Sequence, residues 1–437
     1  MRGPTTGVML VVAAWVACTP LAAGEPLRGA GPLRVESFPL DSSTTVALVE
    51  DHRAPLVALR IAFPAGDWSP WGHERHLREA FEIQLDDSAG ELRADADRLA
   101  AGISLAVGDR STQLRARCLR DDLPQLLDLI REIFSNDTWD RSELRRMARG
   151  RRLSWSAAQR NPFFVGWQAA ARELYGPDDP RRRRWEKPEA AETRASRLAA
   201  TRDALLGLRG RVIGFAGDLT RAEAAAAARE LLPPAGEQPP SGLGPVFGAA
   251  TTQTGEIVVS IPKLTQVYFG YGRESLTYHD PDYPAFLVAD HVLGGHFYSR
   301  LYRALRHEGG ETYSAHSVSY GDTVAGPYRV STYTRLDNAE AVDGKLREVL
   351  RRFHEQGITE TERASAVGAL VGRRRLSRQS PVQVLDRHLR ERALGLTEGF
   401  LDDLVDRAAR LALDEVNAFI ARWYAPRRFS MVRVEPR

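Results

Sequence analysis

From residue 33 onward, hydrophobic and polar residues alternate along the chain. Such alternation is typical of β-strands that bury one face. Residues 33–50 alternate as two strands, and Pro55–Phe63 reads as a third. Further along, Leu119–Phe134 changes to the period of an amphipathic helix, and Asp121 and Asp122 stand where side chains cap a helix start. This helix directly follows an alternating run, so the pattern predicts a strand that leads through an acidic cap into a helix.

The same succession recurs in the second half of the chain. The alternating run Tyr328–Thr334 precedes a helical pattern at Leu336–Phe353. Three pairs of similar segments begin at 113 and 328, at 150 and 373, and at 211 and 429, so their offsets are all about 215 to 223 residues. Similar segments in one order at a nearly constant offset indicate an internal repeat.

The repeat predicts an α+β fold made of two tandem homologous domains, each of roughly 200 residues, a usual domain size. We place the domains at 33–231 and 256–437. Each is expected to be a mixed or antiparallel sheet packed with helices. Residues 232–255 between them are rich in Pro and Gly and have no apolar period, which is typical of an extended linker.

Composition adds limits. The chain has 437 residues, 43% of them apolar and 27% charged, as in ordinary globular proteins. A net charge of +3 is small for this size and argues against a dedicated nucleic-acid binder. Four consecutive arginines at 181–184 lie within 176–192, where a solvated loop is favoured over an anion or membrane site. Cys118 is expected to be a half-buried strand thiol.

The N-terminus predicts export. Arg2 precedes an apolar run from Val8 to Ala23 that ends in small residues, which is the pattern of a secretory signal peptide, here residues 1–24. The run is too short and interrupted for a comfortable membrane span, and no other long apolar stretch follows. We expect an exported protein in the periplasm of a Gram-negative bacterium. Lipid anchoring at Cys18 is a less favoured alternative.

The segment Lys263–Ser314 carries the most specific motifs of the chain. It contains Gln266 near the start of a strand, Leu293-Gly294-Gly295 at the end of a helix, then Ser299-Arg300-Leu301, and Leu305-Arg306 through Tyr313-Ser314. This spaced series resembles the C-terminal half of the M16 (insulinase and pitrilysin-like) metallopeptidases. The resemblance covers the chain from about residue 33 to its end.

The resemblance gives two residues a role. Arg306 sits near the end of a short helix and Tyr313 opens the next strand, so the two can converge. A guanidinium fork and a phenolic hydroxyl suit peptide carbonyls and developing oxyanions. In the family such a pair acts in trans on substrate held by the zinc domain. From the residues alone, a solvated arginine and a half-buried tyrosine are an equally good interpretation.

The family's zinc motif is H-x-x-E-H on a helix, and the repeat aligns it with His76, Glu79 and Ala80 in the stretch WGHERHLREAF. His76 matches the first ligand and Glu79 the general base, but Ala80 has no lone pair to replace the second histidine. Where the distal carboxylate ligand is expected, the sequence has Ser154 and Trp155. The motif is therefore degenerate, and we expect no metal on this chain.

Three functions are compatible with this pattern. The favoured one is a non-catalytic, substrate-orienting subunit of a heterodimeric exported M16-type zinc peptidase that acts on unfolded peptides, with zinc in the partner subunit. Alone, such a chain is expected to be inactive. An alternative is a scaffold or peptide-binding pseudopeptidase with no catalytic role. A further alternative is a self-sufficient zinc peptidase with His73, His76 and an unrecognised carboxylate as ligands. Nucleic acid and a stable membrane span are not expected.

Overall fold

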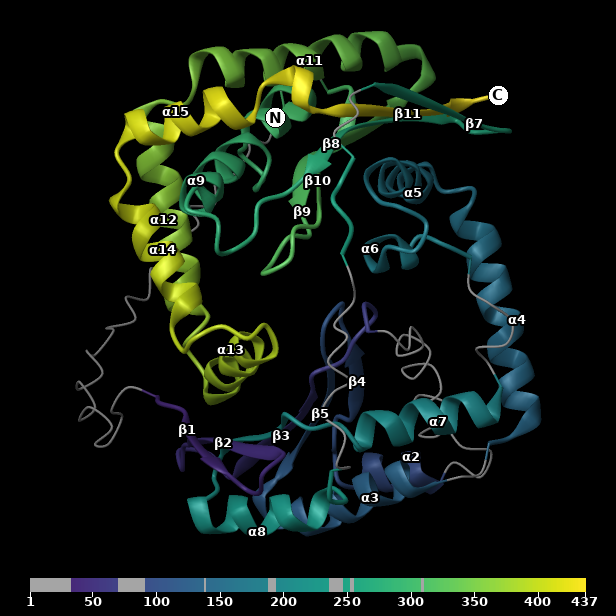
Figure 1. Ribbon diagram of the computed structural model, residues 1–437, viewed down its shortest axis with the longest axis vertical. Coiled ribbons are helices and arrows are strands. Elements are labelled where there is room, and N and C mark those ends of the chain that lie inside the picture. Colours follow the sequence, from purple (N-terminus) through teal and green to yellow (C-terminus); the bar gives the residue numbers. More distant parts are fainter. Residues whose placement is uncertain are drawn as a thin grey trace, which may run out of the picture.

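The computed structural model describes residues 33–69, 91–136, 139–187, 194–235, 247–251, 255–307 and 310–437. The predicted signal peptide and the stretch WGHERHLREAF lie outside these ranges. The described strands form two mixed sheets, one from each half of the sequence, with helices around both (Figure 1). This confirms the predicted α+β class. No helix in the described part is both long and apolar enough to span a membrane.

The N-terminal sheet has six strands in the order β1-β2-β6-β3-β5-β4. β2 and β6 pair in parallel, and the other neighbours pair antiparallel. The sequence pattern predicted the three strands between 33 and 63, but it did not predict β4. The bounds of the six strands are Glu36–Pro39 (β1), Thr44–Glu50 (β2), Leu56–Phe63 (β3), Ser104–Val107 (β4), Thr112–Leu119 (β5) and Arg211–Gly217 (β6).

The C-terminal sheet repeats five of these strands in the order β7-β11-β8-β10-β9. β7 and β11, which correspond to β2 and β6 of the first sheet, pair in parallel, and the other neighbours pair antiparallel. Strand order and pairing sense thus agree between the two sheets, which confirms two homologous copies of one fold. The strands are Glu256–Ile261 (β7), Gln266–Glu274 (β8), Thr312–Ser319 (β9), Pro327–Arg335 (β10) and Ser430–Pro436 (β11).

Helices follow the same repeat. In both halves the strand that precedes the amphipathic helix passes through one short 3-10 turn into that helix. The predicted acidic cap is wrong in detail: Asp122 occupies the cap position, but its side chain makes no capping hydrogen bond. The 3-10 turn 120–122 already leads into the helix with helical backbone angles, so the carboxylate does not reach back to the first N–H groups. The helices used below are Leu123–Ser135 (α3), Arg141–Ala158 (α4), Pro162–Leu174 (α5), Pro180–Arg183 (α6), Arg221–Leu231 (α8), Tyr283–Leu293 (α9), Arg300–Tyr302 (α10), Ala339–Gln356 (α11), Glu360–Leu376 (α12), Pro381–Ala393 (α13) and Phe400–Arg410 (α14).

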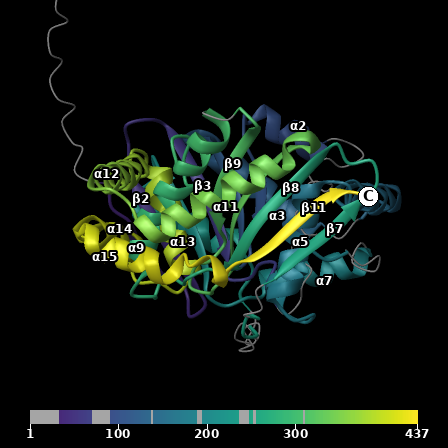
Figure 2. The same cartoon turned by 90° about the horizontal axis from the view of Figure 1, so that it is seen from above.

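Each sheet has one face covered by helices of its own half and the other by a helix of the opposite half. Because side chains alternate along a strand, each strand contributes to both faces. The N-terminal sheet packs α3 and α8 on one face and α13 on the other (Figure 1). The C-terminal sheet packs α11 on one face and α5 on the other (Figures 1 and 2). The two halves therefore exchange one helix each.

Small residues allow both exchanged helices to approach closely. A Cβ on Gly166 of α5 would lie 2.3 Å from Cε1 of Tyr268 in β8. A Cβ on Gly214 of β6 would lie 2.9 Å from Cδ1 of Leu385 in α13. Both distances are shorter than van der Waals contact permits, so larger residues would push the helix away from the sheet. Each exchange thus depends on one glycine at its contact point.

The arginine run is not the solvated loop that we predicted. Arg181 in α6 is 3% exposed and pairs with Asp179 at 2.7 Å and with Glu274 of β8 at 2.7 Å. It also donates to the carbonyl oxygens of Gly248 and Ala325. Sequence charge alone suggested exposure, but this guanidinium is buried between the two halves because carboxylates and carbonyls from both meet it there. Together these bonds fasten the first half to the second.

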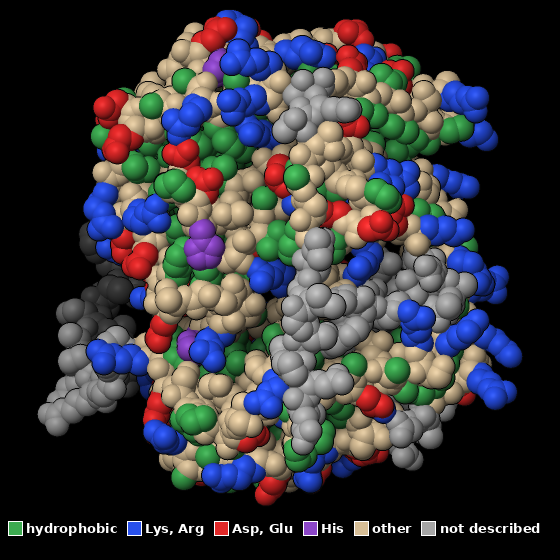
Figure 3. Space-filling model, in the orientation of Figure 1, with side chains coloured by type: hydrophobic (Ala, Val, Ile, Leu, Met, Phe, Trp, Pro, Cys, Tyr) green, Lys and Arg blue, Asp and Glu red, His purple; other side chains and the backbone are tan. Residues whose placement is uncertain are grey.

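Charge is distributed unevenly over the face drawn in Figure 3. Lys and Arg side chains stand along the edge that carries α4, and elsewhere they alternate with Asp and Glu (Figure 3). The sequence of α4 contains six arginines and one glutamate. Cys118 on β5 is 3% exposed, so it is buried rather than half-buried, and burial raises the pKa of its thiol to about 12. A thiol with so high a pKa is an unreactive core residue.

Candidate functional site

The degenerate zinc motif cannot be placed in space, because His76, Glu79 and Ala80 lie outside the described residues. The distal position is described. Trp155 of α4 stands there, and its indole packs edge-on against Phe164 of α5 with ring centroids 5.6 Å apart. Within the described ranges, no group of three or more His, Cys, Asp or Glu side chains is placed to hold a metal ion. An alanine and an indole at two ligand positions do not fit a zinc centre.

Arg306 and Tyr313, the two site residues expected from the resemblance, lie in contact with each other. Ser299 accepts the first hydrogen bond of α10, and the chain continues as one π-helical turn, Arg303–His307 (η3). Gly310 has a φ of 64° and donates its N–H to the carbonyl of Arg306, which ends the turn. Tyr313 then opens β9. Single π turns of this kind are often found at functional sites.

The geometry of the pair is specific. The Arg306 Nη1 donates to the carbonyl oxygen of Tyr313 at 3.0 Å. Its guanidinium carbon lies 4.5 Å from the ring centroid of Tyr313 and 5.0 Å from that of Tyr302. One cation therefore contacts two aromatic rings, an arrangement that restricts all three side chains. Tyr302 is a third residue of this site, and the sequence pattern did not predict it. It directly follows the Ser-Arg-Leu motif, and this position could have indicated that it lies near Arg306.

The support beneath the pair is rigid. Leu301 and Leu305 are fully buried in the C-terminal core, so the turn that carries Arg306 is anchored by two side chains. Arg300 makes a two-bond contact with Glu362 of α12, at 2.8 and 2.7 Å. Such bidentate pairs fix orientation as well as distance. The pair is thus held on a fixed base even though Tyr313 is 71% exposed.

Exposed aromatic residues extend the site. Phe297 and Tyr298 are 70% and 74% exposed, and the Phe297 ring packs against Tyr302 with centroids 5.3 Å apart. Phe297 and Tyr302 form an aromatic surface with Tyr313, because the Arg306 guanidinium contacts both tyrosine rings. Tyr298 follows Phe297 in the chain. Aromatic side chains and arginine are the residue types most enriched at recognition surfaces. The sequence pattern did not predict a role for Phe297 or Tyr298. Two adjacent aromatic residues shortly after Gly294-Gly295 could have indicated an exposed recognition surface.

The repeat also points to α9, the helix that corresponds to the degenerate zinc motif. Asp290 accepts a hydrogen bond from the Tyr328 hydroxyl at 2.9 Å, and burial raises the pKa of its carboxyl. His291 is 6% exposed, its ring stacks on His296 with centroids 4.2 Å apart, and Arg373 contacts its Nδ1 at 3.1 Å. Burial, with His296 and Arg373 adding to it, lowers the pKa of His291 to about 4. At neutral pH this histidine is uncharged.

The low pKa of His291 predicts an acid-sensitive fold. The pKa of His291 in the folded protein, about 4, lies below the ordinary value of 6.5. The stability that the neutral ring contributes is therefore fully present above pH 6.5 and is lost as the pH falls toward 4. We expect His291→Gln, which keeps an acceptor for Arg373 and does not titrate, to remove roughly 2 kcal/mol of the acid-induced loss of stability. Urea unfolding at pH 4, 5, 6 and 7 measures this.

His307 offers a matched control because it is an exposed histidine in the same half. His307→Gln should leave the slope of stability against pH as in the unchanged protein. Equal slopes for His291→Gln and the unchanged protein would contradict the prediction.

Comparisons with known proteins show similarity to M16-type proteins in sequence and in fold. Residues 211–370 match the family profile described as the peptidase M16 inactive domain. An uncharacterized zinc protease of Streptomyces coelicolor is 28% identical over 195 residues, which is 44% of this chain and 42% of that protein. The chain thus matches less than half of that relative's length.

Solved structures extend the likeness to the whole fold. A peptidase M16 inactive domain from Pseudomonas fluorescens superposes with a TM-score of 0.76 at 20% identity, covering 93% of this chain and 99% of that one. The periplasmic protease PqqL of Escherichia coli gives a TM-score of 0.75 at 12% identity, covering all of this chain but 49% of that one. Residues 211–370 therefore match the M16 inactive-domain family, and the two-sheet fold of the whole chain is similar to that of solved M16-type structures.

Proposed function

We propose that this chain is the substrate-orienting subunit of an exported, heterodimeric M16-type zinc peptidase that cleaves unfolded peptides. The observation that carries the proposal is the convergence of Arg306 and Tyr313, held on a rigid base beside an exposed aromatic surface. In this assignment a zinc-bearing partner supplies the metal, its ligands and the general base. This chain supplies hydrogen-bond donors for the peptide carbonyl.

The chemistry asked of Arg306 and Tyr313 is positioning and electrostatic stabilisation. Arg306 offers N–H groups in a fixed plane, and Tyr313 offers one O–H group. Donors that are already aligned stabilise the oxyanion of a tetrahedral intermediate without reorganising during the reaction. The bond from Arg306 to the Tyr313 carbonyl and the contact with Tyr302 keep the guanidinium aligned before substrate arrives. No step requires metal on this chain.

Two further observations support a paired arrangement and export. The match covers 49% of the PqqL chain, so a fold of this size accounts for about half of that chain. A second chain of similar size would complete a comparable molecule. PqqL is periplasmic, and the apolar N-terminal run of this chain with its preceding arginine favours the same compartment.

Complementation tests the proposal. The chain is purified alone and together with a candidate M16 chain that carries an intact H-x-x-E-H motif, and cleavage of a quenched fluorescent peptide is followed. We expect cleavage from the mixture and none from this chain alone. A mixture that cleaves no faster than the partner alone would contradict the proposal and favour the scaffold alternative. Stoichiometric zinc on this chain alone, measured by atomic absorption, would favour the self-sufficient peptidase.

A further inference from the structure

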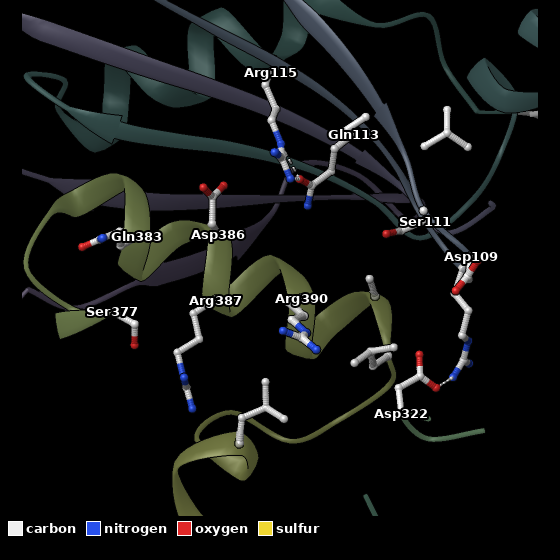
Figure 4. A pocket seen from close by; sticks show the side chains of 17 residues that line it. Asp109, Ser111, Gln113, Arg115, Asp322, Ser377, Gln383, Asp386, Arg387 and Arg390 are labelled. Atoms are coloured by element: carbon white, nitrogen blue, oxygen red, sulfur yellow. Dashed lines mark hydrogen bonds and ion pairs between the residues drawn. The ribbon is translucent and has the colours of Figure 1, made fainter. Parts of the chain in front are cut away.

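A cavity lies between the two halves, apart from the Arg306–Tyr313 site. Its volume is ≈ 640 Å³, and its walls come from β4, β5 and the turn between them on one side and from α13 on the other (Figure 4). The β9–β10 turn contributes Asp322. Neither half alone forms this cavity, because α13 reaches the N-terminal sheet only through the helix exchange.

Four arginines line the cavity. Arg110 in the β4–β5 turn pairs with Asp322, and the other three are Arg115 on β5 and Arg387 and Arg390 on α13 (Figure 4). Arg115 makes two hydrogen bonds to the amide oxygen of Gln113, at 3.1 and 3.0 Å. Arg390 donates to the hydroxyl of Tyr278 at 2.8 Å. Both partners are neutral, so neither bond compensates the positive charge of its arginine.

Arg387 is the most buried of the three, with 18% of its side chain exposed. Its Nη2 lies 2.6 Å from Asp402 Oδ1, but Asp402 also pairs with Arg378. The contact does not align an N–H with the oxygen, and both Nε and Nη2 are buried without a hydrogen-bond acceptor among the described residues. Burial lowers the pKa of Arg387, and the charges of Arg378 and Arg390 add to the effect. A buried donor without an acceptor is costly.

Each of the three carboxylates that line the cavity has an arginine within 4 Å as its partner. Asp386 accepts from Arg60 of β3 at 2.7 and 3.4 Å. Asp322 lies 3.6 Å from Arg110, and Asp109 lies 3.4 Å from Arg184. Around Arg115, Arg387 and Arg390 the described residues therefore leave an excess of guanidinium charge with donors to spare. Arginine forks fit the two oxygens of a carboxylate or phosphate.

We propose that this cavity is an oxyanion-binding site in which Arg387, Arg115 and Arg390 bind a carboxylate of a peptide or a free small oxyanion. For a peptide, this deepens the proposed function and rests on it: acidic peptides would be the preferred substrates. Asp322 follows the end of β9, and Tyr313 lies at its start. Nine extended residues at about 3.3 Å each span at most about 30 Å, so one peptide of that length reaches from the cavity to Tyr313.

Binding to this chain alone tests the site without depending on the partner. Fluorescence anisotropy is measured with a labelled peptide that carries glutamates and with its glutamine counterpart, and inorganic phosphate is titrated by calorimetry. We expect the glutamate peptide or phosphate to bind, and Arg387→Gln and Arg115→Gln each to weaken that binding about 10- to 100-fold, as loss of a charged hydrogen bond predicts. Arg352→Gln on α11 is the matched control and should have no effect.

The arms distinguish the two sources of oxyanion. Glutamate-dependent peptide binding that both variants weaken supports a peptide carboxylate, and phosphate binding alone with the same dependence supports a free oxyanion. Equal affinity for the two peptides with no binding of phosphate would overturn the site, as would unchanged affinities in Arg115→Gln. Because Arg115 is an exposed strand residue, its variant keeps the test valid if Arg387→Gln fails to fold. Cleavage by the two-chain complex is a separate measurement, so failure of the proposed function is recognised independently.

Discussion

Arg306→Ala is expected to lower the rate of peptide cleavage by the complex with a zinc-bearing partner by about 10²- to 10³-fold, the effect of losing one oxyanion donor. The loss should be in kcat more than in KM, because the donor acts on charge that develops in the transition state. Arg306 is held by the Tyr313 carbonyl and two aromatic rings, so Arg306→Lys, which loses the planar fork, should recover little.

Two variants sharpen this test. Tyr313→Phe keeps the ring beneath the guanidinium and removes only the hydroxyl, so its effect reports the hydroxyl alone. Arg303 lies in the same turn with 51% of its side chain exposed, and Arg303→Ala should leave cleavage unchanged. Full activity of the complex that carries both Arg306→Ala and Tyr313→Phe would refute the assigned role, provided that the complex still forms on gel filtration.

Leu385→Ala is expected to lower the free energy of unfolding by about 2–5 kcal/mol, as for other fully buried leucines. Leu385 is 0% exposed and joins α13 to the alanine-rich face of the N-terminal sheet. Its loss leaves a void at the helix exchange, where the two halves meet. Leu376, at the end of α12, is 58% exposed, so Leu376→Ala should cost little. Guanidinium unfolding followed by circular dichroism measures both.

A double-mutant cycle shows whether Leu385 acts through Gly214. A Cβ on Gly214 would lie 2.9 Å from Leu385 Cδ1, so Gly214→Ala alone should destabilise the protein. In the Leu385→Ala background the methyl group has room, and the same substitution should cost less, with a coupling energy of about 0.5–3 kcal/mol. Strictly additive effects would show that the helix does not rest on this glycine.

The hydrophobic pattern of the sequence was enough to determine the repeated fold. Strand period at 55–63 and 328–334, helix period at 336–353, and nearly constant offsets predicted two α+β copies because local periodicity reflects which face of each element is buried. The role of Arg306 and Tyr313 came from the family resemblance, whereas their ability to converge has a local reason. Seven residues across one short turn leave few ways to fold, so their convergence follows from local geometry.

Only the tertiary structure shows which residues of one half contact the other half. The exchange of α5 and α13, the burial of Arg181, and the cavity that Arg115 shares with Arg387 all join residues far apart in sequence. Periodicity shows that a helix has an apolar face but not which sheet will cover it, since burial against either sheet satisfies the same pattern. The charge of an arginine predicts exposure unless distant carboxylates and carbonyls meet it, and only the folded chain brings those groups together.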